Sequence, residues 1–70
     1  MSSNEAAAAA ALLAFGMLSK ALKLAKQLSD VLASMNAYRQ LAVIAYIQGK
    51  EEEALAHLNR HLTLAMTSTN

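Results

Sequence analysis

The residues best suited to chemistry in this sequence are two histidines near its C-terminus. His57 and His61 are four residues apart, and Glu53 precedes His57 by the same interval, so on a helix all three project from one face. Two imidazoles and a carboxylate at this spacing could hold Zn²⁺ or Ni²⁺. The segment HLNRH, however, lacks the glutamate beside the first histidine that a zinc-protease helix needs. We therefore expect no metal site, and only a mild helical pair between Glu53 and His57.

No nucleophile–base arrangement and no glycine-rich phosphate loop is visible in the sequence. The serines fall in expected caps, polar helix faces or the tail, and the two glycines are isolated. Three of the five acidic residues are consecutive, Glu51 to Glu53, at an expected helix start. Catalysis needs polar groups that converge in a pocket, and a chain of 70 residues rich in Ala and Leu has few side chains that could line one. The sequence therefore predicts neither an enzyme nor a bound cofactor.

The composition is that of one small helical domain. Hydrophobic residues make up 56% of the 70 positions but aromatic residues only 4%, because the excess is Ala and Leu, and proline is absent. Cysteine is absent too, so packing or another chain must stabilise the fold. The net charge of +1 gives no field that would attract nucleic acid. The one basic cluster, Lys20, Lys23 and Lys26, is interpreted as a solvated helix face.

The segment from Tyr38 to Leu62 has the pattern of two helices joined by a tight turn. Gly49 stands where a helix C-terminus favours a left-handed residue, and the glutamates Glu51–Glu53 then occupy the first turn of a second helix, where the dipole favours negative charge. Apolar residues recur at helical spacing on both sides of the turn. They are Tyr38, Leu41, Ala42 and Ala45 in the first helix and Ala54, Leu55, Leu58, Leu62 and Ala65 in the second.

This segment resembles a tetratricopeptide (TPR) repeat over residues 36–66. The matching positions are a large residue, a Leu-small pair, the turn glycine, a small residue early in the second helix and two later apolar anchors, namely Tyr38, Leu41-Ala42, Gly49, Ala54, Leu58 and Leu62. The chain departs from the family at His61, where Ala is usual, and no Pro follows the second helix. The resemblance implies a helical module that binds proteins, without naming the partner.

A long helix is predicted before this hairpin. Ser2 and Glu5 have the spacing of a capping box, although Ser3 or Asn4 could cap the helix instead. The six alanines Ala6–Ala11 strongly favour helix. Residues 6–18 carry no charge, but a membrane span takes about 20 apolar residues, so this run is too short. No basic segment precedes it, as one would in a signal peptide. We therefore expect a cytoplasmic protein.

The predicted long helix is apolar on all sides at first and one-sided later. From Ser19 onward a polar face develops, and Leu12 and Phe15 lie on the side that becomes polar. One hairpin cannot cover both that pair and the stripe from Leu18 to Leu32, so we expect another chain to bind there. Apolar residues of the next helix flank its core face in the same way. The predicted partner-binding residues are Leu12, Phe15, Leu18, Leu22, Val43, Ile44 and Ile47.

The sequence thus predicts an all-α fold, in which a long N-terminal helix is followed by a TPR-like helix-turn-helix hairpin. A first break is expected at residues 34–37, where Ser34 or Asn36 could cap a following helix. Without that break the first helix would run on to Gln48. The expected parts of this single domain, residues 1–70, are a cap at 1–4, helices at about 5–34 or 5–35, 37–48 and 51–66, and a frayed tail at 67–70.

The favoured function is a small helical adaptor or co-chaperone that binds a helical protein through apolar helix faces. In size, class and lack of cysteine the chain resembles the small co-chaperones of bacterial secretion systems, such as type III secretion, which pair with a TPR-type partner. The alternative is a self-assembling homo-oligomer, natural or designed. A third interpretation is a helix on a membrane surface. Lys20, Lys23 and Lys26 disfavour it, because they follow the most apolar part rather than lie opposite it.

Overall fold

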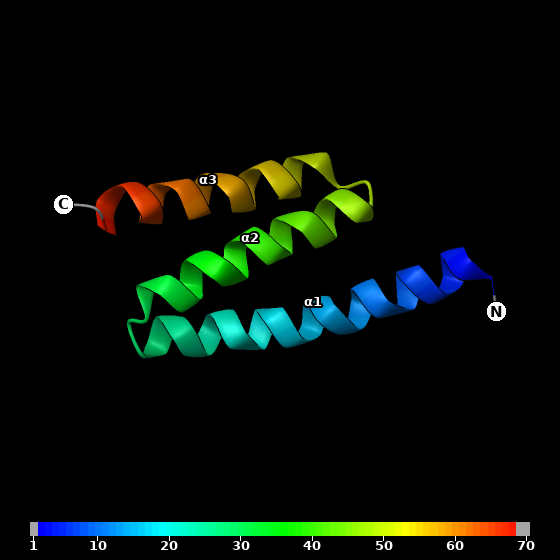
Figure 1. Cartoon of the computed structure of the whole chain (residues 1–70), viewed down its shortest axis with the longest axis horizontal. Helices are drawn as coiled ribbons and strands as arrows, with labels where there is room; N and C mark the ends of the chain where they lie inside the picture. The colour runs from blue at the N-terminus through cyan, green and yellow to red at the C-terminus, as the bar shows by residue number, and fades with distance from the viewer. Residues whose placement is uncertain (1, 69–70) are drawn as a thin grey trace.

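The computed structural model describes residues 2–68, and these form three α-helices: α1 (Ser3–Gln27), α2 (Val31–Ile47) and α3 (Glu51–Ser68). No strand occurs among the described residues, so the predicted all-α fold is confirmed. The helices run antiparallel in an open layer with α2 in the middle (Figure 1). Within residues 2–68, α2 packs against both neighbours, whereas α1 and α3 do not pack against each other. The fold is therefore not a closed bundle.

The first break lies at residues 28–30, so the predicted break at 34–37 is wrong, as is the alternative of one helix running to Gln48. Ser29 has a φ of 55°, in the left-handed region. Its N–H donates to the carbonyl of Lys26 (3.1 Å), and the N–H of Asp30 donates to that of Ala25 (2.8 Å). These two bonds define a Schellman motif, which ends α1 without a glycine.

The cap of α2 is Asp30 rather than Ser34 or Asn36. One Asp30 carboxylate oxygen accepts the N–H of Ala33 at 3.0 Å, which satisfies a backbone donor at the helix start. Ser34 lies one turn inside the helix, where its hydroxyl donates to the carbonyl of Asp30 (2.9 Å). Asn36 is further inside still. Because Asp30 provides the cap, α2 begins six residues earlier than the predicted residue 37.

The second turn, residues 48–50, follows the prediction closely. Gly49 has a φ of 76°, and the three glutamates open α3. The N–H of Gly49 donates to the carbonyl of Tyr46 (3.0 Å), and that of Lys50 donates to the carbonyl of Ala45 (2.8 Å). This is the same motif as the first turn, so two hairpins of one geometry share α2.

The two ends of the chain differ in how well the sequence predicted them. The capping box is confirmed, because the Glu5 N–H donates to the Ser2 hydroxyl (3.2 Å) and the Ser2 N–H to the Glu5 carboxylate (3.4 Å). At the other end, Thr67 and Ser68 belong to α3 rather than to a frayed tail. The rest of that predicted tail, residues 69–70, lies outside the described residues, as does Met1.

The core is centred on α2 and is made largely of small residues. The buried residues are Ala11 and Ala25 of α1, Ser34, Ala37, Tyr38, Leu41, Ala42, Ile44 and Ala45 of α2, and Ala54 of α3. The predicted apolar stripe of the last helix is wrong for Leu55, Leu58 and Leu62, which are 61%, 40% and 54% exposed. Since α1 does not reach α3, only one narrow face of α3 meets a neighbour, and Ala54 in its first turn is the buried residue of that face.

Candidate interaction surfaces

The seven predicted partner-binding residues fall into three environments. Ile44 is buried, Leu18 and Leu22 are half-buried, and Leu12, Phe15, Val43 and Ile47 are exposed. Ile44 is therefore part of the fold's own core and offers no surface to a partner. The exposed residues divide again, because Leu12 and Phe15 belong to α1 and the other two to α2.

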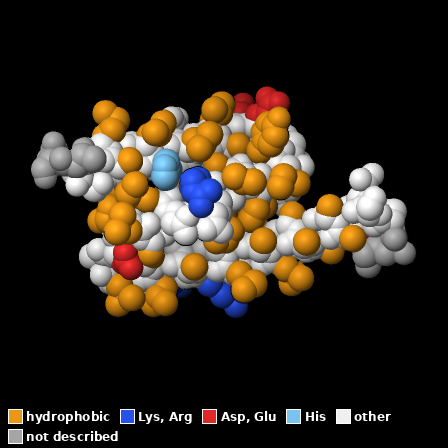
Figure 2. Space-filling view, in the orientation of Figure 1, with side chains coloured by type: hydrophobic (Ala, Val, Ile, Leu, Met, Phe, Trp, Pro, Cys, Tyr) orange, Lys and Arg blue, Asp and Glu red, His pale blue; other side chains and the backbone are white. Residues whose placement is uncertain are grey.

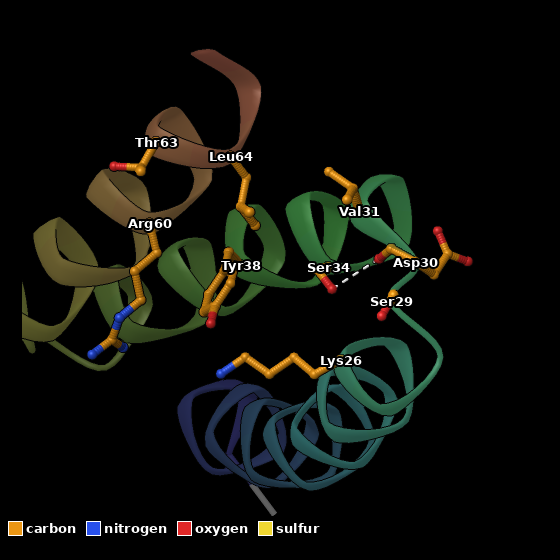
Figure 3. Close-up of a pocket in the computed structure, with 9 residues that line it drawn as sticks. All are labelled: Lys26, Ser29, Asp30, Val31, Ser34, Tyr38, Arg60, Thr63 and Leu64. Atoms are coloured by element: carbon orange, nitrogen blue, oxygen red, sulfur yellow. Dashed lines mark hydrogen bonds between the residues drawn. The ribbon is translucent and has the colours of Figure 1, made fainter. Parts of the chain in front are cut away.

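A groove runs between α1 and α3 with α2 as its floor, and we call this side of the layer the groove face. It consists of two hollows of about 540 Å³ each, which share Lys26 and Arg60. In Figure 3 the Lys26 side chain extends from α1 beneath Tyr38, and Arg60 descends from α3 beside it. The lining of the groove includes Ser34, Tyr38 and Leu41 on the floor, Phe15, Leu22, Lys23 and Lys26 on α1, and Glu53, His57 and Arg60 on α3.

Tyr38 links all three helices at the centre of the groove. The Lys26 ammonium lies 5.6 Å from the centroid of its ring, within the range of a cation–π contact. The ring of His57 lies 6.2 Å from it, centroid to centroid, at a tilt of 32°. A cation from α1 and an imidazole from α3 thus meet one aromatic side chain of α2.

The two histidines make different contacts. The Nδ1 of His61 lies 2.9 Å from the carbonyl oxygen of Met35, and since a carbonyl only accepts, Nδ1–H donates and ties α3 to α2. The Nδ1 of His57 is buried without a hydrogen-bond partner. Among residues 2–68, no three His, Cys, Asp or Glu side chains are grouped so that they could hold a metal ion.

The environment of His57 favours its neutral form. Burial lowers the pKa of His57 below its usual value of 6.5, and the nearby Arg60 cation lowers it further. Glu53 acts in the opposite direction and is outweighed. The predicted pair of Glu53 and His57 is therefore not what determines the charge of this imidazole, and the wall of the groove at His57 is neutral.

The opposite side of the layer is apolar on all three helices, and we call it the apolar face. Between α2 and α3 it has a hollow of about 420 Å³ in which Glu51 is the only charged lining residue. Figure 2, which views this face, shows hydrophobic side chains spread over all three helices. Helix geometry puts three exposed α1 residues and the C-cap residue Leu28 on this side, opposite Phe15, Lys23 and Lys26. The apolar face comprises Leu13, Met17 and Leu24 of α1, Leu28 at its C-cap, Val43 and Tyr46 of α2, and Leu55 and Leu58 of α3.

The apolar face was not predicted from the sequence, where one helical wheel was continued through residues 28–30. The true end of α1 at Gln27 breaks that wheel. A wheel restricted to residues 3–27 separates Leu13, Met17 and Leu24 from the stripe that packs on α2. The signal for this part of the apolar face was thus present in the sequence.

Helix α1 is also long and apolar enough to cross a membrane, by length and composition alone. It has 25 residues, and its most apolar window has a mean hydropathy of 1.5 and is 6% buried. The prediction of too short an apolar run counted only the uncharged residues 6–18, whereas the helix continues beyond Lys20 with further leucines. A core helix or an N-terminal signal sequence can pass the same test, so a cytoplasmic location stays a prediction.

No protein-family model, no curated protein and no solved structure matches this chain. The similarity to a TPR repeat therefore stays a resemblance.

Proposed function

We propose that this protein is a non-catalytic interaction module, a small helical adaptor or co-chaperone, whose groove face binds a helix of another protein. The observation that carries the proposal is the open groove. Helices α1 and α3 flank α2 without meeting, so α2 has neighbours on two sides and a hollow between them. A helix laid in this hollow would contact all three helices, which is the helix-in-groove mode of recognition.

The chemistry of the groove specifies the kind of helix that fits. Exposed apolar surface in the groove comes from Phe15 of α1, which lies above a floor where Tyr38 and Leu41 are buried. On α1, Leu12 lies on the same side as Phe15 and extends this surface toward the N-terminus. Three cations line the groove, Lys23, Lys26 and Arg60, but only two carboxylates do, Glu53 and Asp30, so its lining carries a net positive charge. The expected partner is therefore an amphipathic helix with an apolar stripe and acidic residues beside it.

The test is the double change Leu12→Ser with Phe15→Ser. Both side chains are exposed in the isolated chain, so the helices should keep their circular dichroism spectrum. Binding of a purified partner, measured by titration calorimetry, should weaken at least about tenfold, because burying each such side chain contributes about 1.5–3 kcal/mol. Leu24→Ser, on the opposite side of α1, is the matched control and should leave the affinity unchanged. Equal binding by wild type and the double variant would refute the proposal.

The narrower assignment to bacterial secretion systems, type III secretion among them, concerns the identity of the partner. It is supported only by the small size, the helical class and the absence of cysteine. A partner with TPR repeats would support it. A partner of another architecture would remove it and leave the groove proposal intact.

A second candidate function is attachment to a membrane through α1. A core helix of a soluble protein is mostly buried, whereas only 6% of the apolar window of α1 is buried. The basic residues Lys20, Lys23 and Lys26 would then lie at the headgroup level at one end of the helix. Flotation with vesicles of neutral and of anionic lipid tests this function. Recovery of the chain with the vesicles supports it, and failure to float with either kind removes it.

A further inference from the structure

The chain exposes more surface than a compact monomer of its mass. Its solvent-accessible area is 5180 Å². A compact monomeric protein of 7.4 kDa exposes about 4200 Å². The excess of about 1000 Å² is close to the ~800 Å² that each partner contributes to a protein–protein interface of standard size. One further layer of protein would therefore account for it.

The apolar face contains several large side chains that are exposed in the single chain. Leu24, Leu28 and Tyr46 are 56%, 69% and 71% exposed, although each lies beside other large apolar side chains. Continuous apolar patches of more than a few hundred Å² are uncommon on monomers and mark interaction sites. The groove face differs, because cations and carboxylates interrupt its apolar residues.

The few charges of the apolar face are suited to a self-complementary contact. Glu51 lies at the end of the face near the second turn, and Arg39 lies on the same side of α2 as Val43 and Tyr46. The Arg39 guanidinium donates to the side-chain oxygen of Asn36 (2.8 Å), and neither charged group forms an ion pair within residues 2–68. A two-fold axis would let the arginine of each copy approach the glutamate of the other, so one patch can serve both subunits.

We infer that a second copy of this chain covers the apolar face, so that two three-helix layers pack face to face in a symmetric dimer. In this dimer both grooves stay open on the outer sides. Their use by partner helices rests on the proposed function. A dimer of this kind would bury the apolar residues of all three helices at once. It would also make the protein a bivalent adaptor, with one groove per subunit.

The experiment measures the mass of the full chain by sedimentation equilibrium between about 5 and 200 µM. Wild type should reach twice the chain mass of 7.4 kDa. The double change Leu24→Ser with Leu55→Ser, on the apolar face, should weaken dimerisation at least tenfold while the circular dichroism spectrum is retained. The matched control is the groove-face pair Leu12→Ser with Phe15→Ser, which should still dimerise like wild type.

Two results would overturn the dimer. A wild-type chain that is a monomer at 200 µM would do so, and it would leave the groove proposal untouched because partner binding is measured separately. A dimer lost in the groove-face variant but kept in the apolar-face variant would mean that the second copy occupies the groove. That result would also contradict the proposed function, whereas loss of partner binding by the groove-face variant within an intact dimer would support both proposals.

Discussion

The two turns of this protein have the same backbone geometry and different residues. Ser29 and Gly49 are twenty residues apart, and both have positive φ, 55° and 76°. In each turn the N–H of the next residue donates at 2.8 Å to the carbonyl of an alanine, Ala25 in one turn and Ala45 in the other. The hairpins of α1–α2 and α2–α3 are thus two copies of one device that share the middle helix.

The same comparison explains why small residues surround both turns. Ala25 and Ala45 precede the turns and are buried, and Ser34 and Ala54, at equivalent places after them, are buried too. Side chains of this size let the helices approach closely where the chain reverses. A left-handed residue is required at the turn itself, but glycine is not. A residue with a Cβ takes this conformation at a cost of about 1–2 kcal/mol.

The largest expected effect comes from the helix that both hairpins share. Leu41 of α2 is 3% exposed, whereas Leu58 of α3 is 40% exposed. Leu41→Ala should lower the free energy of unfolding by about 2–5 kcal/mol, because it leaves a cavity in the core. In the monomer, at a protein concentration too low for dimerisation, Leu58→Ala should cost less than Leu41→Ala, since its side chain is already partly in contact with water. Urea titration followed by circular dichroism, at one protein concentration, measures both, and equal losses would contradict a core centred on α2.

The next largest effect is expected from replacing the left-handed residue of the second turn. Gly49→Val should destabilise the protein by about 1–2 kcal/mol, because a β-branched residue is strained at positive φ. A Cβ at this position meets no atom within 4 Å, so the loss would come from the backbone and not from a clash. Gly16→Ala in the middle of α1 has equal space and should stabilise by up to about 1 kcal/mol. A neutral Gly49→Val would show that the second turn has a different conformation.

A smaller effect of opposite sign is expected at the first turn. Ser29→Gly should stabilise the protein by about 0.5 kcal/mol, since relief of the left-handed strain exceeds the entropy that glycine loses on folding. Ser29→Ala, which keeps the strain, is the control and should bring no gain. Thermal unfolding of the three proteins at equal concentration compares them. A loss of stability in Ser29→Gly would mean that the serine side chain contributes more to this turn than its backbone conformation costs.

The smallest effect is a pH dependence confined to the second hairpin. Burial, and then Arg60, lower the pKa of His57 in the folded state, so the unfolded chain binds a proton more readily. The contribution of neutral His57 to the free energy of unfolding is therefore fully present above the unfolded pKa of about 6.5. It decreases as the pH falls from there toward the lower pKa of the folded state. Urea midpoints between pH 7.5 and 5 should decline by less in His57→Gln than in wild type. Identical pH profiles would contradict a neutral His57 in the groove wall.

The sequence alone determined the features that depend on a few neighbouring residues. The pairing of Ser2 with Glu5, the left-handed turn at Gly49 and the acidic start of α3 were all predicted correctly. Each of these rests on backbone groups within one helical turn, where the residue type specifies the hydrogen bond or the dihedral angle. The all-α class followed in the same way from composition and the absence of proline.

The tertiary structure alone decided where α1 ends and which faces stay open. Ser29 carries no glycine-like signal, so the first break had to be found from the hydrogen bonds of Asp30 and not from residue type. The exposure of Leu55 and Leu58 likewise depends on a neighbour that α3 does not have, since α1 packs only on α2. Periodicity shows that a helix has an apolar side. Whether that side is covered depends on contacts between residues far apart in the chain, and no local pattern contains them.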